Sequence, residues 1–222
     1  MKAAAYIATK NLYWSVLPSI KSLLIHSDVD KVYLLIEDDR FPQELPNEVE
    51  VINVTKEKPY VSMDTVRCIL ADLFPELDII MSADVDTFAI KDVSGIWDLP
   101  LGDEYYFAAA KEPVRCMHGL VYADVGVALF NLKKIREDKK AKEFIKLATD
   151  TTLSIPEKSA INYACQKHIL DMPSKYNASR FTKPPEENRI IHYDGYEKWN
   201  NKPEFIRYDS FSLERVHAMR RT

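Results

Sequence analysis

The N-terminal half of this 222-residue chain alternates short apolar runs with segments whose apolar residues have helical spacing. Strands are predicted over 3–9, 31–37, 49–54 and 78–83, and helices over 15–27 and 63–77. Strands separated by helices of this length imply a parallel sheet with crossover connections. Ligands of such sheets bind beyond the carboxyl ends of the strands. Two polar segments, 8–11 and 84–86, occupy such ends.

The C-terminal half continues with both patterns and shows no convincing domain boundary. Further strands are predicted over 105–112 and 122–132, and further helices over 133–150 and 156–169. Residues 172–188 are rich in Pro, Ser and Asn and are predicted to form an ordered surface loop. The basic tail at 215–222 is expected to be a solvated end. We therefore predict a single α/β domain over 1–222.

The composition argues against several classes of protein. A net charge of −4 disfavours a general nucleic-acid binder, because no broad basic face is available to neutralise phosphates. No run of about eighteen apolar residues occurs, so no membrane span is expected. The five glycines form neither a GxGxxG nor a P-loop pattern, which disfavours dinucleotide and P-loop nucleotide sites.

The cysteines bear on the cellular compartment. Cys68, Cys116 and Cys165 are odd in number, widely separated and without metal-ligand spacing. Buried, reduced thiols are the expected state. The first residues reach polar side chains too soon for a signal peptide. A cytoplasmic protein is expected.

Two carboxylates one residue apart, Asp84 and Asp86, directly follow the apolar run at 78–83. Burying paired carboxylates beside a hydrophobic strand is costly unless something neutralises them. Two hard oxygen ligands at a strand end suit Mg²⁺ or Mn²⁺ and leave positions open for phosphate oxygens. Two exposed loop aspartates would produce the same letters, so further context is needed.

That context is a second cluster at 190–199, where a short apolar stretch leads to His192, Gly195 and Lys198. His192 offers a third metal ligand, Gly195 lets the backbone approach a phosphate, and Lys198 supplies positive charge. Taken alone, a histidine is more often structural. Its conjunction with the two aspartates favours a metal-dependent phosphate site.

Four segments, in order, resemble the glycogenin-type glycosyltransferases of family eight, which include bacterial lipooligosaccharide galactosyltransferases. Residues 6–23 look like the family's opening strand, uridine-binding loop and first helix, and 82–87 occupy the place of its D-x-D. Residues 122–132 resemble its Y-F-N-x-G-V strand, and 192–199 its H-x-x-G-x-x-K-P-W without the proline.

The resemblance implies a GT-A type fold, a Rossmann-like mixed, mainly parallel sheet flanked by helices in a single domain. A nucleotide-binding half over 1–100 and a sugar- and acceptor-binding half over 101–222 are implied. The expected reaction moves a hexose-type sugar from a UDP-sugar to a carbohydrate or glycoconjugate acceptor, with retention of anomeric configuration. The sequence gives no indication of an oligomeric state.

The resemblance also implies roles for individual residues. Asp84, Asp86 and His192 would ligate Mn²⁺, or alternatively Mg²⁺, bridging the nucleotide diphosphate. The residues implied to bind the donor are Ala8, Thr9, Asn11, Tyr13, Arg67, Val85, Gly126, Gly195 and Lys198. Among them Tyr13 is expected to stack on uracil, and Arg67 to reach the donor sugar and diphosphate.

Departures from the family pattern concern the sugar site. Asp124 replaces the asparagine of N-x-G, and an ionised aspartate only accepts hydrogen bonds, so a different choice of sugar is expected. The D-Q-D-x-x-N motif reads PEKSAIN here, with Glu157, Lys158 and Ser159 at its first three positions. The transfer chemistry is therefore in question. The catalytic candidates are Asp124, Glu157 and Lys158, and none is assigned as a nucleophile.

Two alternative functions stay open at the level of sequence. Asp84-Val85-Asp86-Thr87 also matches the start of haloacid-dehalogenase phosphatases, with Asp84 as the phosphorylated nucleophile. That family needs a later acidic pair, and the only Gly-Asp, at Gly102, is not followed by the required aspartate. The second alternative is a non-catalytic nucleotide-sugar-binding protein of the same fold.

Overall fold

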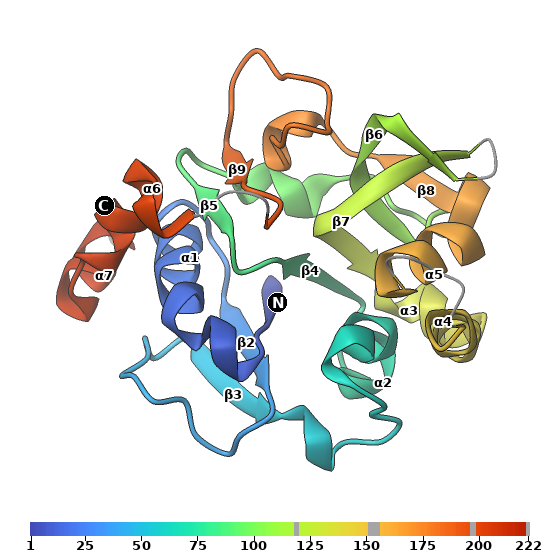
Figure 1. The fold of residues 1–222 in the computed structure, drawn as a ribbon, viewed down its shortest axis with the longest axis horizontal. Coiled ribbons are helices and arrows are strands. Elements are labelled where there is room, and N and C mark those ends of the chain that lie inside the picture. Colours follow the sequence, from blue (N-terminus) through green and yellow to red (C-terminus); the bar gives the residue numbers. More distant parts are fainter. Residues whose placement is uncertain (118–119, 151–155, 196–198, 221–222) are drawn as a thin grey trace.

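A seven-stranded sheet with strand order β3-β2-β1-β4-β7-β6-β8 forms the centre of the molecule (Figure 1). The computed structural model describes residues 1–117, 120–150, 156–195 and 199–220. The strands are β1 (Ala3–Ile7), β2 (Lys31–Ile36), β3 (Val49–Asn53), β4 (Ile79–Ala83), β6 (Phe107–Met117), β7 (Leu120–Asn131) and β8 (Ile169–Asp171). The neighbouring strands β3, β2, β1 and β4 pair in parallel, and so do β6 and β8. Strand β7 is antiparallel to both of its neighbours, β4 and β6. The predicted mixed, mainly parallel sheet is confirmed.

Helices cover both faces of this sheet (Figure 1). They are α1 (Tyr13–Ile25), α2 (Leu70–Leu73), α3 (Leu132–Glu137), α4 (Lys140–Ala148), α5 (Pro156–Cys165), α6 (Pro203–Asp209) and α7 (Leu213–Arg220). The single helix predicted over 63–77 is instead a 3-10 helix, Met63–Ile69, followed by the short α2. Among the described residues, no helix has the length and apolar character needed to cross a membrane.

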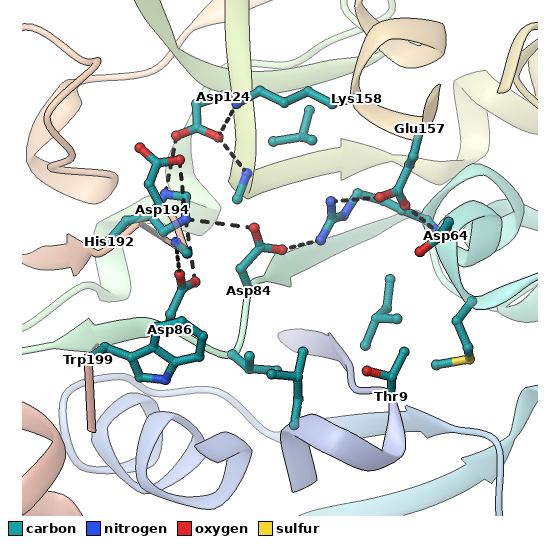
Figure 2. Close-up of a pocket in the computed structure, with 18 residues that line it drawn as sticks. Thr9, Asp64, Asp84, Asp86, Asp124, Glu157, Lys158, His192, Asp194 and Trp199 are labelled. Atoms are coloured by element: carbon teal, nitrogen blue, oxygen red, sulfur yellow. Dashed lines mark hydrogen bonds and ion pairs between the residues drawn. The ribbon is translucent and has the colours of Figure 1, made fainter. Parts of the chain in front are cut away.

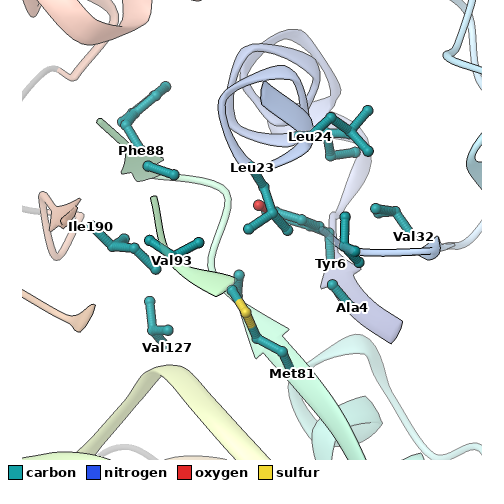
Figure 3. Close-up of a cluster of buried hydrophobic side chains, with 14 of the residues drawn as sticks. Ala4, Tyr6, Leu23, Leu24, Val32, Met81, Phe88, Val93, Val127 and Ile190 are labelled. Atoms are coloured by element: carbon teal, nitrogen blue, oxygen red, sulfur yellow. The ribbon is translucent and has the colours of Figure 1, made fainter. Parts of the chain in front are cut away.

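The strands carry two separate cores because their side chains alternate between the faces. In β1, Ala4 and Tyr6 belong to the core under α1, α6 and α7, whereas Ala3 and Ala5 belong to the core under α2 to α5. Figure 3 shows the first core, in which Tyr6 lies among side chains of α1, β2 and β4. Burial on both faces explains why the central strands read as continuous apolar runs.

A second, two-stranded sheet joins distant parts of the chain. Strand β5 (Thr87–Ala89) follows the D-x-D turn and pairs antiparallel with β9 (Ile190–His192), so that Thr87 lies opposite His192. Phe88 of β5 is fully buried and stacks on Tyr208 of α6. This packing anchors the small sheet against the helices that cover the first core.

Two predicted helices of the C-terminal half have wrong boundaries. The helix predicted over 133–150 is divided into α3 and α4, because Lys139 adopts the left-handed conformation with φ of 55°. No glycine or proline marks this break in the sequence. The helix predicted over 156–169 ends at Cys165, and β8 then pairs parallel with β6 at the sheet edge.

The prediction of a solvated C-terminal tail was also wrong for its described part. Val216 of α7 is fully buried in the core under α1. Arg220 donates to the Val29 carbonyl at 2.6 Å and pairs with Glu48 at 3.2 Å. The tail therefore packs as a helix whose basic end is held by specific partners.

Candidate active site

A cavity of about 450 Å³ lies beyond the carboxyl ends of β1 and β4 (Figure 2). Thr9 and Asp84 line it, and each follows one of these two adjacent parallel strands. Among the residues that the structure describes, the lining carries six carboxyl groups, from five aspartates and one glutamate, against two permanent cations, Arg67 and Lys158. This excess of negative charge favours the binding of a cation.

The D-x-D turn is fixed by the strands around it. The Asp84 amide donates to the Gly126 carbonyl of β7 at 2.7 Å, and the Thr87 hydroxyl donates to the Asp84 carbonyl at 2.7 Å. Asp86 accepts a hydrogen bond from the Gly195 amide at 2.6 Å. This amide is therefore directed at Asp86, which ties the D-x-D turn to the segment that follows β9.

His192 reaches the two aspartates through the pairing of β5 and β9. Its Nε2 lies 3.7 Å from an Asp84 oxygen, 3.5 Å from an Asp86 oxygen and 3.8 Å from an Asp194 oxygen. Ligand atoms that share one divalent cation at about 2.1 Å lie roughly 3.0–3.5 Å apart. The three distances from Nε2 lie at or slightly above the upper end of that range. Carboxylate oxygens and an imidazole nitrogen are ligands that suit a divalent cation.

Asp194 was missed by the sequence analysis. Its backbone is left-handed, with φ of 60°, and the following Gly195 has φ of 65°. Aspartate tolerates this conformation better than most residues. The sequence signal was present, since Asp194 lies between the predicted His192 and Gly195, but the family pattern leaves this position unspecified.

The other ring nitrogen of His192, Nδ1, faces Asn177 Oδ1 at 2.9 Å and Asp124 Oδ2 at 3.2 Å. Burial alone disfavours a charged imidazole, but the carboxylates of Asp124 and Asp86 raise the pKa of His192 well above its ordinary value. Asn177 is fully buried and was not predicted as a site residue.

Gly126 makes room for this imidazole. A Cβ atom added there would lie 2.1 Å from His192 Cε1, closer than any real contact. The β7 backbone therefore packs directly against the ring face, which only glycine allows. The resemblance placed Gly126 at the donor sugar, and in the structure it also shapes the position of His192.

Arg67 connects the D-x-D turn to α5. This buried guanidinium donates to Ser82 Oγ at 3.0 Å, to Glu157 at 3.2 Å and to Asp84. Glu157 also accepts from the Arg67 amide at 3.0 Å. Burial raises the pKa of Glu157 to about 7, although Arg67 opposes this shift. Arg67 thus lines the cavity while being paired with two carboxylates.

Lys158 bridges two buried carboxylates. Its Nζ donates to Glu112 at 2.6 Å and to Asp124 at 2.9 Å. Although burial opposes ionisation, His192 and Lys158 hold the pKa of Asp124 far below its usual range. Glu112 comes from β6 and was not predicted, because nothing in its local sequence separates it from a surface strand residue.

Only some of the residues predicted to bind the base and ribose line the cavity. Thr9 and Leu12 line the cavity, whereas Ala8 is fully buried. Tyr13 points elsewhere: its ring packs on Phe41 and its hydroxyl donates to Asp38 at 3.0 Å. The cavity lining contains neither Asn11 nor Tyr13 among the residues described.

Other predicted residues have mixed outcomes. Val85, Gly126 and Gly195 line the cavity, as do the three catalytic candidates. Lys198 lies outside the residues that the structure describes. Trp199, which was not assigned a role, also lines the cavity and stacks on Trp14 with ring centres 5.9 Å apart.

Comparison with known proteins identifies the family and the fold of the chain. The sequence model of glycosyl transferase family 8 matches residues 20–202, and no curated protein sequence matches significantly. Among solved structures, the glycosyltransferase GlyE of Streptococcus pneumoniae TIGR4 is 20% identical with a TM-score of 0.76, covering 97% of this chain and 62% of that one.

The galactosyltransferase LgtC, solved with donor and acceptor sugar analogs, is 15% identical with a TM-score of 0.72, covering 99% of this chain and 95% of that one. The apo structure of the bifunctional glycosyltransferase WbbM is 14% identical with a TM-score of 0.72, covering 100% of this chain and 52% of that one. The chain thus spans less than two thirds of the length of GlyE and WbbM. It has the GT-A fold and belongs to glycosyl transferase family 8.

Proposed function

We propose that this glycosyltransferase is metal-dependent and moves a hexose from a UDP-sugar to a carbohydrate or glycoconjugate acceptor. The observation that carries the proposal is the convergence of Asp84, Asp86 and His192 on one point of the cavity wall. Mn²⁺ is the proposed ion, with Mg²⁺ as the alternative. A divalent cation held there would neutralise charge on the diphosphate leaving group.

The protein's own residues orient this site. Asp86 is fixed by the Gly195 amide, and Asp84 by Arg67 and the β7 backbone. Because both carboxylates are held before any ligand arrives, little reorganisation is needed when a cation binds. Lys198 is proposed to contact the diphosphate, on the strength of the sequence pattern alone.

Retention of anomeric configuration is proposed to proceed by attack on the same face as the leaving group. Asp124 is poorly suited to form a covalent glycosyl intermediate, since its side chain is 1% exposed and both oxygens are engaged within the protein. Glu157 lines the cavity but accepts two hydrogen bonds from Arg67. A free carboxylate nucleophile is thus not supplied by either candidate.

The protein is proposed to act in the cytoplasm on a glycan acceptor. Because the chain belongs to family 8, the interpretation of Asp84 as the nucleophile of a haloacid-dehalogenase phosphatase is disfavoured. The altered PEKSAIN segment, with Lys158 at the family's glutamine and Ser159 at its second acid, favours a non-catalytic sugar-nucleotide-binding protein. The two functions differ in donor hydrolysis.

The test is thermal stabilisation by UDP with and without Mn²⁺, followed by hydrolysis of a panel of UDP-hexoses. We expect UDP with Mn²⁺ to raise the melting temperature, and Asp84→Asn to abolish the metal-dependent part. Asp64→Asn is the matched control, because Asp64 lines the cavity but lies outside the candidate metal cluster. Stabilisation without hydrolysis of any donor would favour the binding protein, and no stabilisation would overturn the proposal.

A further inference from the structure

The orientation of His192 is determined by the contacts that its ring makes on the side facing away from Asp84 and Asp86. Asn177 donates through Nδ2 to the Asp124 carbonyl at 3.2 Å, which turns its Oδ1 toward His192 Nδ1. The Asp124 carboxylate faces the same nitrogen. Both oxygens accept hydrogen bonds, so Nδ1 is the donor on this side of the ring. Nε2 is thereby left facing the two aspartates, where its lone pair becomes available to a cation that displaces the proton between them.

Asp124 uses both carboxylate oxygens inside the protein. Oδ1 accepts from the Gly126 amide at 3.0 Å and from Lys158 Nζ at 2.9 Å, and Oδ2 faces His192. The side chain is 1% exposed. Because almost none of this carboxylate is open to a sugar hydroxyl, Asp124 is better placed to act on His192 than on the donor sugar.

Lys158 stabilises the buried carboxylates of this arrangement. Glu112 and Asp124 are almost completely buried, and the Lys158 ammonium lies between them at 2.6 and 2.9 Å. Without that cation, the two buried carboxylates would lose the positive charge that they share. The acid at 124 and the base at 158 therefore depend on one another.

We infer that Asp124, Lys158 and Asn177 are positioning residues that hold His192 as an Nε2 metal ligand. The family pattern has an asparagine at position 124 and a glutamine at position 158. In this chain Asp124 and Lys158 replace these two amides and form an ion pair, so the two opposite charges balance each other. A carboxylate behind a ligating imidazole fixes the ring and raises the basicity of the ligating nitrogen. The inference rests on the proposed metal dependence.

The experiment measures Mn²⁺ binding by calorimetry without nucleotide, and the coupling of Mn²⁺ to imidazole nitrogen by pulsed electron paramagnetic resonance. The wild type is expected to bind Mn²⁺ with a clear nitrogen coupling. Asp124→Asn places an amide that can donate toward Nδ1, so affinity should fall about 10–100-fold and the coupling should weaken. Asp138→Asn, an ion-paired aspartate away from the cavity, is the matched control.

A second pair of variants separates positioning from folding. Lys158→Gln leaves Glu112 and Asp124 without their shared cation and should lower the melting temperature. Adding Asp124→Asn to it removes one of the two carboxylates and should restore much of that loss. Mn²⁺ affinity should nevertheless stay at the level of Asp124→Asn alone, because His192 still lacks its carboxylate.

The outcomes are distinguishable. If wild type fails to bind Mn²⁺, the proposed metal-dependent function fails before any variant is compared. If wild type binds and Asp124→Asn binds within twofold of it with the same nitrogen coupling, the positioning role is overturned. Recovery of both stability and affinity in the double variant would also contradict it, since a purely structural pair predicts that result.

Discussion

Thr87 lies opposite His192 in the antiparallel pair of β5 and β9. This pairing places the imidazole beside Asp84 and Asp86 of the D-x-D turn (Figure 2). Thr87 and His192 are far apart in sequence, and one strand pair brings them together. Because β5 starts directly after Asp86, any shift of His192 relative to this turn changes the spacing of the candidate metal ligands. The first prediction concerns the wall against which His192 is held.

Gly126→Ala should remove the metal-dependent stabilisation by UDP. Its Cβ would clash with His192 at 2.1 Å, so the ring must leave its position. Gly102→Ala is the matched control: its left-handed φ of 50° makes alanine strained there, but no atom lies within 4 Å of the added carbon. Thermal melts with UDP and Mn²⁺ should show the metal effect in Gly102→Ala and not in Gly126→Ala. Equal metal effects in both variants would contradict this role of Gly126.

Asp194→Asn should weaken Mn²⁺ binding by about tenfold while leaving the backbone unchanged. Asparagine tolerates the left-handed conformation at this position as well as aspartate does. The substitution therefore removes a negative charge 3.8 Å from His192 Nε2 without adding strain. Calorimetric titration with Mn²⁺ measures the effect, with Asp64→Asn as control. Unchanged affinity would show that Asp194 lies near the ion without contributing to its binding.

Arg67→Met should destabilise the metal-free protein by about 3 kcal/mol, at the lower end for a broken buried pair. Glu157 loses its buried cation, whereas the Asp84 side chain is 37% exposed and is partly screened by solvent. Arg67 pairs with Asp84 and Glu157 and its side chain is 6% exposed. Urea unfolding in the presence of a chelator measures the loss. Adding Glu157→Gln should recover part of it, because one uncompensated charge is removed. A loss below about 1 kcal/mol, as for an exposed pair, would contradict the buried ion-pair description.

Glu157→Gln should flatten the dependence of stability on pH. Burial raises the pKa of Glu157 from 4.5 to about 7 in the folded protein. The folded state therefore binds the proton more tightly than the unfolded state, and stability falls as pH rises from about 4.5 to 7. The shift corresponds to a loss of about 3 kcal/mol.

Chemical denaturation between pH 4.5 and 8, with a chelator present, measures this slope. The wild type should lose stability relative to Glu157→Gln across that range and run parallel to it above. Glu137→Gln, on the exposed side of α3, serves as the control and should follow the wild type. A difference between wild type and Glu157→Gln that is independent of pH would contradict the raised pKa.

The sequence predicted the fold where strands are buried on both faces, and the site where ionisable side chains follow such strands. The apolar runs of β1, β2 and β4 identified the parallel sheet because both faces of these strands are buried. Asp84, Asp86 and His192 stood out because charged and imidazole groups beside apolar strands need a partner. Their convergence was predicted, and the structure brings His192 Nε2 to 3.7 Å from an Asp84 oxygen and 3.5 Å from an Asp86 oxygen.

Other features depend on geometry that single positions do not encode. Leu12 and Tyr13 are neighbours in sequence, yet Leu12 lines the cavity whereas Tyr13 packs on Phe41. Asn177 lies in a loop whose composition indicated no more than a turn-rich surface. Lys139 breaks the helix after α3 without glycine or proline, so local propensity gave no warning.

Asp84, Asp86 and His192 are proposed to hold one divalent cation in the site of this glycosyltransferase. The most direct measurement is a crystal structure with UDP and Mn²⁺, with anomalous diffraction used to locate the ion. We predict one anomalous peak bonded to all three side chains at about 2.0–2.3 Å and to the diphosphate. A peak that contacts none of the three, or UDP bound with full occupancy and no ion at this position, would contradict the account.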